Sequence, residues 1–272
     1  MSPTSEHPRP SAIAMRGVEV LVSDRTTPPV PRRRRGRTDA GRAPDAAPAH
    51  ARPPGVPAGM LRILGPVDLT LTEHRVAFIG SNGSGKSTLA RLVNGLVTPS
   101  RGTVEVDGID VTEDAAAVRR RVGFAFTDPE AQLVMPTPAE DLALSLRRSG
   151  ADKAQRRAMA LAALAEHGLE HLADTSVHAL SGGQKQMLAL AGVLATGPRI
   201  VVADEPTTLL DLRNTRRIGD LLLGLEQRLV LVTHDLDLAA RCDRVVVVED
   251  GAVAYDGAPD DAIAHYRALV AP

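Results

Sequence analysis

The chain has 272 residues, a formal net charge of −1 and 43% hydrophobic residues, which excludes an intrinsically disordered protein and predicts a soluble globular one with a substantial core. No apolar run approaches the roughly 18 residues that span a bilayer, so we expect no transmembrane helix. The first fifteen residues are polar and dotted with proline, so we expect no signal peptide. The single cysteine, Cys242, has no partner for an internal disulfide, and we interpret it as a small apolar residue in a reducing cytoplasm.

The N-terminal part of the chain combines a predicted strand with a low-complexity segment. Residues Ile13–Val22 predict a first strand. The segment that follows is rich in Pro, Ala, Gly and Arg, and it includes a basic run at 31–37. Such a composition buries too little apolar surface to offset the entropy of ordering, so we predict a disordered Arg/Pro-rich insertion over 28–59. A basic run could contact anionic lipid or nucleic acid, but we favour a solvated loop and expect no nucleic-acid partner.

Order is expected to resume at Leu61, and a glycine-rich motif follows. Residues 67–71 alternate as an edge strand does, and the apolar run Val76–Ile79 predicts a buried strand. The apolar spacing of 89–93 predicts a helix. Between them, the sequence fits G-x-x-x-x-G-K-[ST] at every fixed position. The residues of this motif are Gly80, Ser81, Asn82, Gly83, Ser84, Gly85, Lys86, Ser87 and Thr88.

A strand, a glycine-rich turn and a helix N-terminus in this order predict a phosphate-binding loop. Glycines let the backbone curl so that several N–H groups point at an anion, and the helix N-terminus adds a partial positive charge. Lys86 can reach the β- and γ-phosphates of a nucleotide, and the Ser87 hydroxyl can bind Mg²⁺. The alternative is a glycine-rich loop that carries a lysine by chance, and the flanking strand and helix argue against it.

The middle of the chain predicts further strands and then a block of helices. Short strands are expected at 102–108 and 122–126. Helical patterns follow at 139–148 and 152–167. Because no strand pattern occurs in this block, we predict a separate helical subdomain over 127–180.

Three motifs in the C-terminal half stand at the ends of predicted elements. Leu180–Gln184 precedes an apolar helix, so small residues and backbone N–H groups lie at a helix start. The run Ile200–Pro206 predicts a buried strand that ends in Asp204 and Glu205, and the next apolar strand ends in His234. Because ligands of parallel sheets bind at the carboxyl ends of strands, we expect these side chains to meet the phosphate-binding loop. A hairpin and a short amphipathic helix are expected to complete the chain.

The order of these motifs resembles the nucleotide-binding subunit of an ABC transporter. The resemblance rests on the P-loop, Leu180–Gln184 as the family signature, Ala203–Pro206 as the Walker B end, Asp211 in the D-loop and His234 as the switch histidine. It implies an α/β ABC ATPase fold over 1–272, with a RecA-like P-loop NTPase core, an antiparallel β region and the helical subdomain. It also implies a homodimer, or a heterodimer with another ABC ATPase, that holds two ATP molecules between P-loops and signatures.

The resemblance also implies roles for the site residues, with ATP and Mg²⁺ as cofactors. Lys86 and Mg²⁺, the latter bound by Ser87 and Asp204, would neutralise the charge that develops on the phosphates. Glu205 would polarise the attacking water, and His234 would hold water and phosphate in register, so Glu205, His234 and Lys86 form the expected catalytic set. The signature residues expected to contact ATP from the other subunit are Ser181, Gly182, Gly183 and Gln184.

Two residues depart from the family pattern. The family usually has a glutamine in the coupling loop, which helps bind Mg²⁺ and reports the nucleotide to the membrane partner, and this chain has Thr127 there. The adenine-stacking aromatic of the family falls at Val22, so about 1 kcal/mol of stacking is lost and base selectivity is relaxed. Neither change removes the phosphate chemistry, and we predict an active ATPase.

A finer resemblance is to the energy-coupling factor (ECF) class of vitamin and metal importers. It rests on residues 128–137, which include Gln132, and on 139–143. Within this class, 204–214 and 233–239 look most like the ATPases of biotin uptake, followed by those of cobalt and nickel uptake. The resemblance implies a membrane T subunit that contacts the groove beside Gln132, a substrate-binding S subunit, and a peripheral location at the cytoplasmic face of the cell membrane.

Other functions stay open at this point. One alternative is a soluble ABC ATPase that acts on ribosomes or DNA, although the chain has a single cassette and no long coiled-coil insertion. Another is a hydrolysis-poor half of a heterodimeric pair, which Thr127 and Val22 suggest. The transported substrate is left undecided, because the substrate does not contact this subunit.

Overall fold

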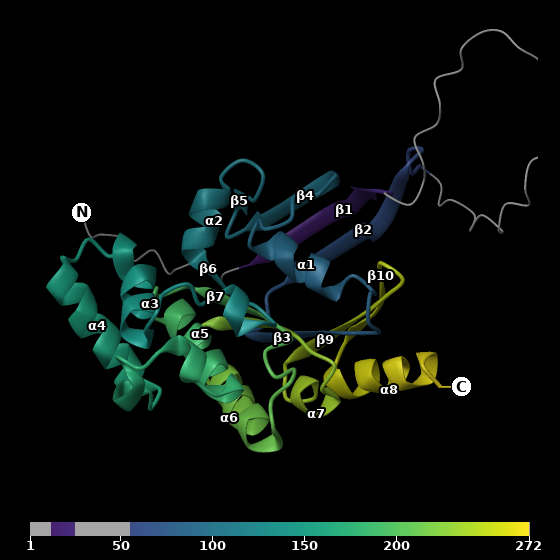
Figure 1. The fold of residues 1–272 in the computed structure, drawn as a ribbon. Helices are drawn as coiled ribbons and strands as arrows, with labels where there is room; N and C mark the ends of the chain where they lie inside the picture. The colour runs from purple at the N-terminus through teal and green to yellow at the C-terminus, as the bar shows by residue number, and fades with distance from the viewer. Residues whose placement is uncertain (1–11, 25–54, 272) are drawn as a thin grey trace, which may run out of the picture.

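The structure is a computed structural model, and it describes residues 12–24 and 55–271. Figure 1 shows a small sheet above a larger one, with a group of helices at one side of the molecule and further helices beneath the larger sheet. The basic run 31–37 and most of the predicted insertion 28–59 lie outside the described residues. The predicted α/β class, with an antiparallel region beside a mixed core, is confirmed.

The larger sheet has six strands in the order β10-β9-β3-β8-β7-β6. Every neighbouring pair is parallel except β10 with β9, which form the predicted hairpin. The parallel strands are mostly apolar and rich in Val, as expected of strands that are covered on both faces. Their bounds are β3 Arg75–Ile79, β6 Val122–Ala125, β7 Ile200–Asp204, β8 Arg228–Val232, β9 Arg244–Glu249 and β10 Ala252–Gly257.

The smaller sheet has the order β2-β1-β4-β5 and is antiparallel. The edge position predicted for 67–71 agrees with β2, which is longer than expected. The segment 55–59, inside the predicted insertion, leads into β2, and Val56 is buried. Ordered packing therefore resumes before Leu61, because Val56 supplies an apolar side chain. The strand bounds are β1 Ile13–Ser23, β2 Met60–Leu71, β4 Arg101–Val106 and β5 Ile109–Asp110.

Alternate residues of the larger sheet face two different hydrophobic cores. On β3, Val76 and Phe78 pack with the smaller sheet and with α1 (Lys86–Val93). Ala77 and Ile79 belong to the other core, which the remaining long helices cover. All four side chains are fully buried, so both faces contribute hydrophobic stabilisation of about 25 cal/mol per Å² of buried apolar area.

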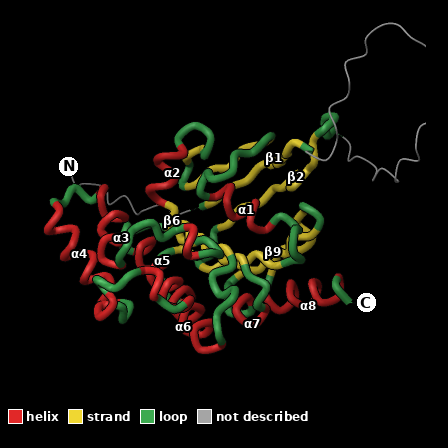
Figure 2. Tube along the Cα trace, in the orientation of Figure 1, coloured by secondary structure: helices red, strands yellow, loops and turns green. Residues whose placement is uncertain are grey.

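The block 127–180 contains helices and no strand. Its hydrophobic side chains belong to the same cluster as the lower face of the sheet, because α5 packs between the two. Figure 2 shows these helices in red at the side of the molecule. Within the described residues, no helix is both long and apolar enough to cross a membrane. The α-helices are α2 Ala115–Arg121, α3 Pro138–Ser145, α4 Lys153–Glu166, α5 Gly182–Leu194, α6 Leu212–Leu223, α7 Leu236–Ala239 and α8 Pro259–Leu269, and the short 3₁₀ helices are η1 Pro129–Ala131, η2 Leu146–Arg148, η3 Glu170–Leu172 and η4 Val177–Ala179.

The shared core leads to a prediction about cooperativity. Leu164 on α4 is fully buried, so Leu164→Ala should lower the free energy of unfolding of the whole chain by about 2–5 kcal/mol. Met159 on the same helix is 41% exposed, and Met159→Ala should cost less than about 1 kcal/mol. Urea denaturation followed by circular dichroism measures both, and a separate early transition confined to Leu164→Ala would show that the helical block folds independently.

Candidate functional site

The predicted phosphate-binding loop joins β3 to α1. Gly80 has a φ of 147°, and a Cβ atom there would lie 1.9 Å from the carbonyl oxygen of Val248, so no side chain fits. Lys86 is the first residue of α1, and its Nζ donates hydrogen bonds to the carbonyl oxygens of Gly80 and Ser81 at 2.9 and 2.7 Å. The loop therefore curls around the ammonium at a helix N-terminus, where free backbone N–H groups favour an anion.

The Lys86 side chain lies in a protein environment rich in carboxylates. The residue is only 6% exposed, and this burial lowers the pKa of Lys86. Neighbouring acidic side chains oppose the shift by stabilising the ammonium. An anionic ligand in the loop would act in the same direction as these carboxylates. The acidic residues concerned are Glu205, Glu249 and Asp204.

Asp204, the last residue of β7, has a fully buried side chain with both carboxylate oxygens bonded. The Ser87 hydroxyl donates to Oδ1 at 2.7 Å, and Arg91 Nη2 donates to Oδ2 at 3.2 Å. The Thr127 hydroxyl donates to the backbone carbonyl of Asp204 at 2.8 Å. Thr127 thus lies at the site, just after β6, but its hydroxyl bonds the Asp204 backbone. The Asp204 carboxylate is bonded by the α1 residues Ser87 and Arg91 instead.

Glu205 and His234 form the second pair. His234 Nδ1 lies 2.7 Å from Glu205 Oε2, so the imidazole N–H can donate to the carboxylate. Glu205 has a positive φ of 53°, and its backbone N–H donates to the Val232 carbonyl at the end of β8. A non-glycine residue in this conformation is strained, and the bond to β8 helps to hold it there. The Glu205 side chain is 15% exposed and that of His234 is 62% exposed, so the pair lies at the protein surface.

A hollow of about 610 Å³ opens over these groups. It brings together the start of the P-loop, the Glu205–His234 pair and Thr127, which come from four different strand ends. Tyr266 on α8 also lines it. The full set of lining residues is Gly80, Ser81, Asn82, Thr127, Glu205, Thr208, His234 and Tyr266.

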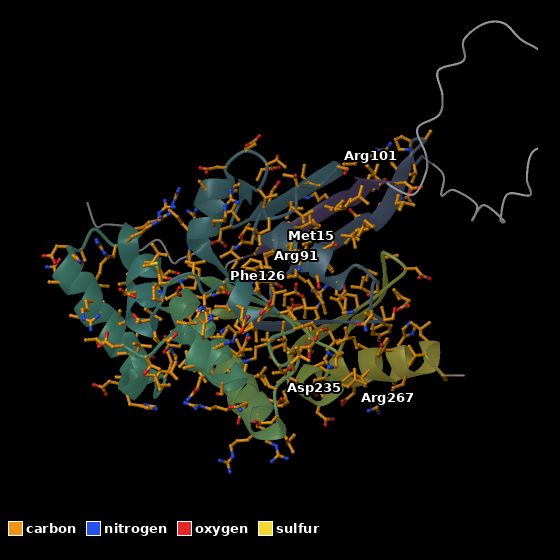
Figure 3. All side chains as sticks on the ribbon, in the orientation of Figure 1. Met15, Arg91, Arg101, Phe126, Asp235 and Arg267 are labelled. Carbon is orange, nitrogen blue, oxygen red and sulfur yellow. The ribbon has the colours of Figure 1, made fainter. Side chains whose placement is uncertain are left out.

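Sequence reasoning missed four residues at or beside the site, of which Thr208 donates its hydroxyl to Glu205 at 3.4 Å. Glu249, the last residue of β9, accepts a hydrogen bond from the Ser81 hydroxyl at 2.6 Å, and its position at a strand end could have identified it. Arg91 could have been found from its spacing of four residues after Ser87, which places both on one face of α1. Figure 3 labels Arg91 near the centre of the molecule. Tyr266 had no signal in the sequence, because only the docking of α8 brings it to the hollow.

The signature residues do not line this hollow. Ser181 and Gln184 form a reciprocal capping box at the N-terminus of α5. A Cβ atom at Gly183 would lie 2.5 Å from the Asn214 side chain, so α5 and α6 approach closely there. Asn214 in turn donates to Asp211, the N-cap of α6, at 2.8 Å. The signature and the D-loop therefore form one unit, apart from the P-loop of the same chain.

Gln132 and Val22 occupy the two remaining predicted positions. Gln132 Nε2 donates to the Ala189 carbonyl on α5 at 2.8 Å, and its Oε1 accepts from the Phe126 backbone N–H at 3.4 Å. The side chain thus ties the end of β6 to the signature helix. Val22 lies near the end of β1, where it pairs with Leu61, and it is 40% exposed.

Comparison with known proteins identifies the family. A family model described as ABC transporter matches residues 64–208. The chain is 44% identical to the biotin transport ATP-binding protein BioM of Rhizobium etli, over 80% of this chain and 96% of that protein. It is 40% identical to the energy-coupling factor transporter ATP-binding protein EcfA1 of Lactiplantibacillus plantarum, over 72% of this chain and 71% of that protein.

Among solved structures, the chain is similar to the ATP-binding cassette MJ0796, in a dimeric post-hydrolysis state bound to ADP and phosphate. The TM-score is 0.71 at 27% identity, over 91% of this chain and 98% of that chain. The fold, the P-loop and the sequence relatives agree with one another. The chain therefore belongs to the ABC transporter family as one of its ATP-binding, ATP-hydrolysing subunits, and within that family it resembles the ATPases of energy-coupling factor and biotin transport.

Proposed function

We propose that this chain hydrolyses ATP to power an ECF-type importer of a vitamin such as biotin. The observation that carries the proposal is that the Glu205–His234 pair lines one hollow together with the start of the P-loop. Beside this hollow, Lys86 bonds the loop carbonyls, and the buried Asp204 bonds Ser87 at the start of α1. The identity to BioM and EcfA1 supports the class of transporter. The assignment of biotin as the cargo rests on the name of BioM and on the resemblance of residues 204–214 and 233–239 to the ATPases of biotin uptake.

The P-loop would bind the β- and γ-phosphates. The backbone N–H groups at the start of α1 and the Lys86 ammonium would replace water around the phosphates, and Lys86 would exchange its bonds to Gly80 and Ser81 for phosphate oxygens. Such positioning and charge neutralisation account for most of the catalysis in phosphoryl transfer.

The residues present fit a magnesium ion. Mg²⁺ prefers oxygen ligands and is usually bound by one or two protein groups together with substrate phosphates. Ser87 Oγ and Asp204 Oδ1 are two oxygens only 2.7 Å apart, next to the phosphate-binding loop. We place the ion against these two atoms, where it would neutralise charge on the phosphates. Asp204 would hold it from a fully buried position at the end of β7.

Glu205 would orient the attacking water. Its Oε2 is held by His234, and its Oε1 makes no hydrogen bond to any described residue, which leaves that oxygen to accept a proton from water. The second ring nitrogen of His234 makes no hydrogen bond to any described residue, and it would donate to the γ-phosphate in the form that carries a proton on both nitrogens, because a neutral ring has a single N–H. The strained backbone of Glu205 supports this assignment, because strain of this kind is concentrated at functional sites.

A second ATPase subunit would complete the site. The signature residues stand at the N-terminus of α5, a helix end that favours phosphate, yet none of them lines the hollow of their own chain. A head-to-tail dimer would place the Ser181 end of one copy over the P-loop of the other. The dimeric state of the cassette MJ0796 supports the presence of a second ATPase subunit. The partner is a second copy of this chain or another ABC ATPase.

The membrane-embedded T subunit would contact the groove beside Gln132. A hollow of about 430 Å³ lies elsewhere on the helical block, between α2, η2, α4 and the end of α5, and Arg119, Arg120 and Arg148 line it. Gln132 and α5 connect the groove to the signature. In this arrangement the chain is a peripheral protein at the cytoplasmic face of the cell membrane, and the S subunit binds the cargo.

The proposed role of Glu205 leads to a prediction about catalysis. Glu205→Gln should lower the rate of ATP hydrolysis by about 100-fold or more, because the amide cannot accept the proton, while the affinity for ATP changes little. Steady-state phosphate release and fluorescent-nucleotide titration measure the two quantities. Glu226→Gln, on a surface loop, is the matched control and should behave as wild type. If Glu205→Gln keeps more than about a tenth of the activity, the assigned role is wrong.

The absence of an aromatic ring at Val22 leads to a prediction about nucleotide affinity. Val22 is 40% exposed, so a larger side chain has room at this position. Val22→Tyr should lower KM for ATP by about fivefold through stacking on adenine, with kcat nearly unchanged. The same change at the neighbouring exposed residue, Leu61→Tyr, serves as the control. An unchanged KM ratio between ATP and inosine triphosphate in Val22→Tyr would contradict the placement of the base beside β1.

A further inference from the structure

Both oxygens of the Asp204 carboxylate are bonded by one face of α1. Ser87 and Arg91 are one helical turn apart, and they bond Oδ1 at 2.7 Å and Oδ2 at 3.2 Å. α1 contacts β7 directly, so the helix that carries the P-loop also holds the carboxylate of the neighbouring strand. This is a specific arrangement of a hydroxyl and a guanidinium on opposite sides of one carboxylate.

The charge of the Asp204 carboxylate is balanced by Arg91. The Asp204 side chain is fully buried, and a buried carboxylate needs a positively charged or hydrogen-bonding partner. Among the described residues, Arg91 is the only cation in direct contact with it, because the Lys86 ammonium bonds carbonyl oxygens instead. The pair carries no net charge, and Oδ1 is already occupied by the Ser87 hydroxyl.

Arg91 does not belong to the hollow that the nucleotide would occupy. Its side chain is 42% exposed, and its buried Nε has no hydrogen-bond partner among the described residues. Direct contact with ATP is therefore not the role that this geometry favours. Its effect must pass through Asp204.

We propose that Arg91 is a positioning residue that makes metal binding at Asp204 depend on bound nucleotide. It holds Oδ2 so that Oδ1 faces Ser87, and its charge cancels the attraction that a buried carboxylate alone would exert on a divalent cation. Only the phosphates of ATP supply the additional negative charge that brings the metal in. This inference rests on the proposed placement of Mg²⁺ at Ser87 and Asp204.

A purely structural salt bridge between α1 and β7 makes a different prediction. Loss of a structural bond would loosen the site and leave metal binding unchanged or weaker. Loss of a competing charge would make metal binding without nucleotide tighter. The sign of the change therefore separates the two roles.

The experiment measures binding of Mn²⁺ alone by electron paramagnetic resonance, on wild type, Arg91→Met and Arg91→Lys. Arg91→Met should bind Mn²⁺ without nucleotide about tenfold more tightly than wild type, because one like charge next to a divalent cation has been removed. Arg91→Lys keeps the charge and should remain close to wild type. Arg241→Met, which breaks the exposed ion pair with Asp220, is the matched control for charge removal and should also resemble wild type.

A second titration, of ATP in the presence of EDTA, tests whether Arg91 acts through Asp204. The affinity of Arg91→Met for metal-free ATP should stay within about twofold of wild type. The proposal is overturned if Arg91→Met binds Mn²⁺ no more tightly than wild type, if Arg241→Met tightens it equally, or if metal-free ATP binding collapses in Arg91→Met. Failure of the wild type to bind ATP at all would refute the proposed function instead, and the Mn²⁺ result would still decide the role of Arg91.

Discussion

Parallel pairing of β9, β3, β8, β7 and β6 is the constraint on which the rest of the structure depends. It forces the carboxyl ends of all five strands to one edge of the sheet, and each of these ends carries a polar group of the candidate site. The two faces of the sheet are closed by separate hydrophobic cores, so the strands cannot shift in register without exposing apolar side chains. The rigid sheet therefore sets the spacing between the phosphate-binding loop, the buried carboxylate and the Glu205–His234 pair.

The site formed by this edge is complete on one side only. The P-loop half has Lys86 bonded to the loop carbonyls and the Glu205–His234 pair beside it, whereas the signature half forms its own unit through Gly183, Asn214 and Asp211. Gln132 links the two halves of the chain by bonding both α5 and the end of β6. These two bonds place the Gln132 side chain between the end of β6 and the signature helix.

Much of this arrangement could be predicted from the sequence, because its signals are local. The P-loop, the strand that ends in Asp204 and the capping box at Ser181 are each short patterns with a direct physical cause. Arg91 and Glu249 had weaker signals, a helical spacing and a strand end, and the atoms that they bond are known only from the structure. Tyr266 could not be predicted in the same way, because only the docking of α8 brings it to the hollow. The same holds for α6, which was not predicted, and for Val56, whose burial is invisible in a segment rich in Pro and Gly. Thr127 is a further example, since only the structure shows that its hydroxyl bonds the Asp204 backbone.

The central claim is that one chain supplies the P-loop and another supplies the signature. The most direct test mixes two inactive variants, Lys86→Ala and Ser181→Arg, and measures ATP hydrolysis of the mixture. A mixed dimer contains one site with an intact P-loop and an intact signature, so the account predicts that activity returns on mixing, although each variant alone is inactive. A mixture as inactive as its components, with both variants folded and able to associate, would contradict the account.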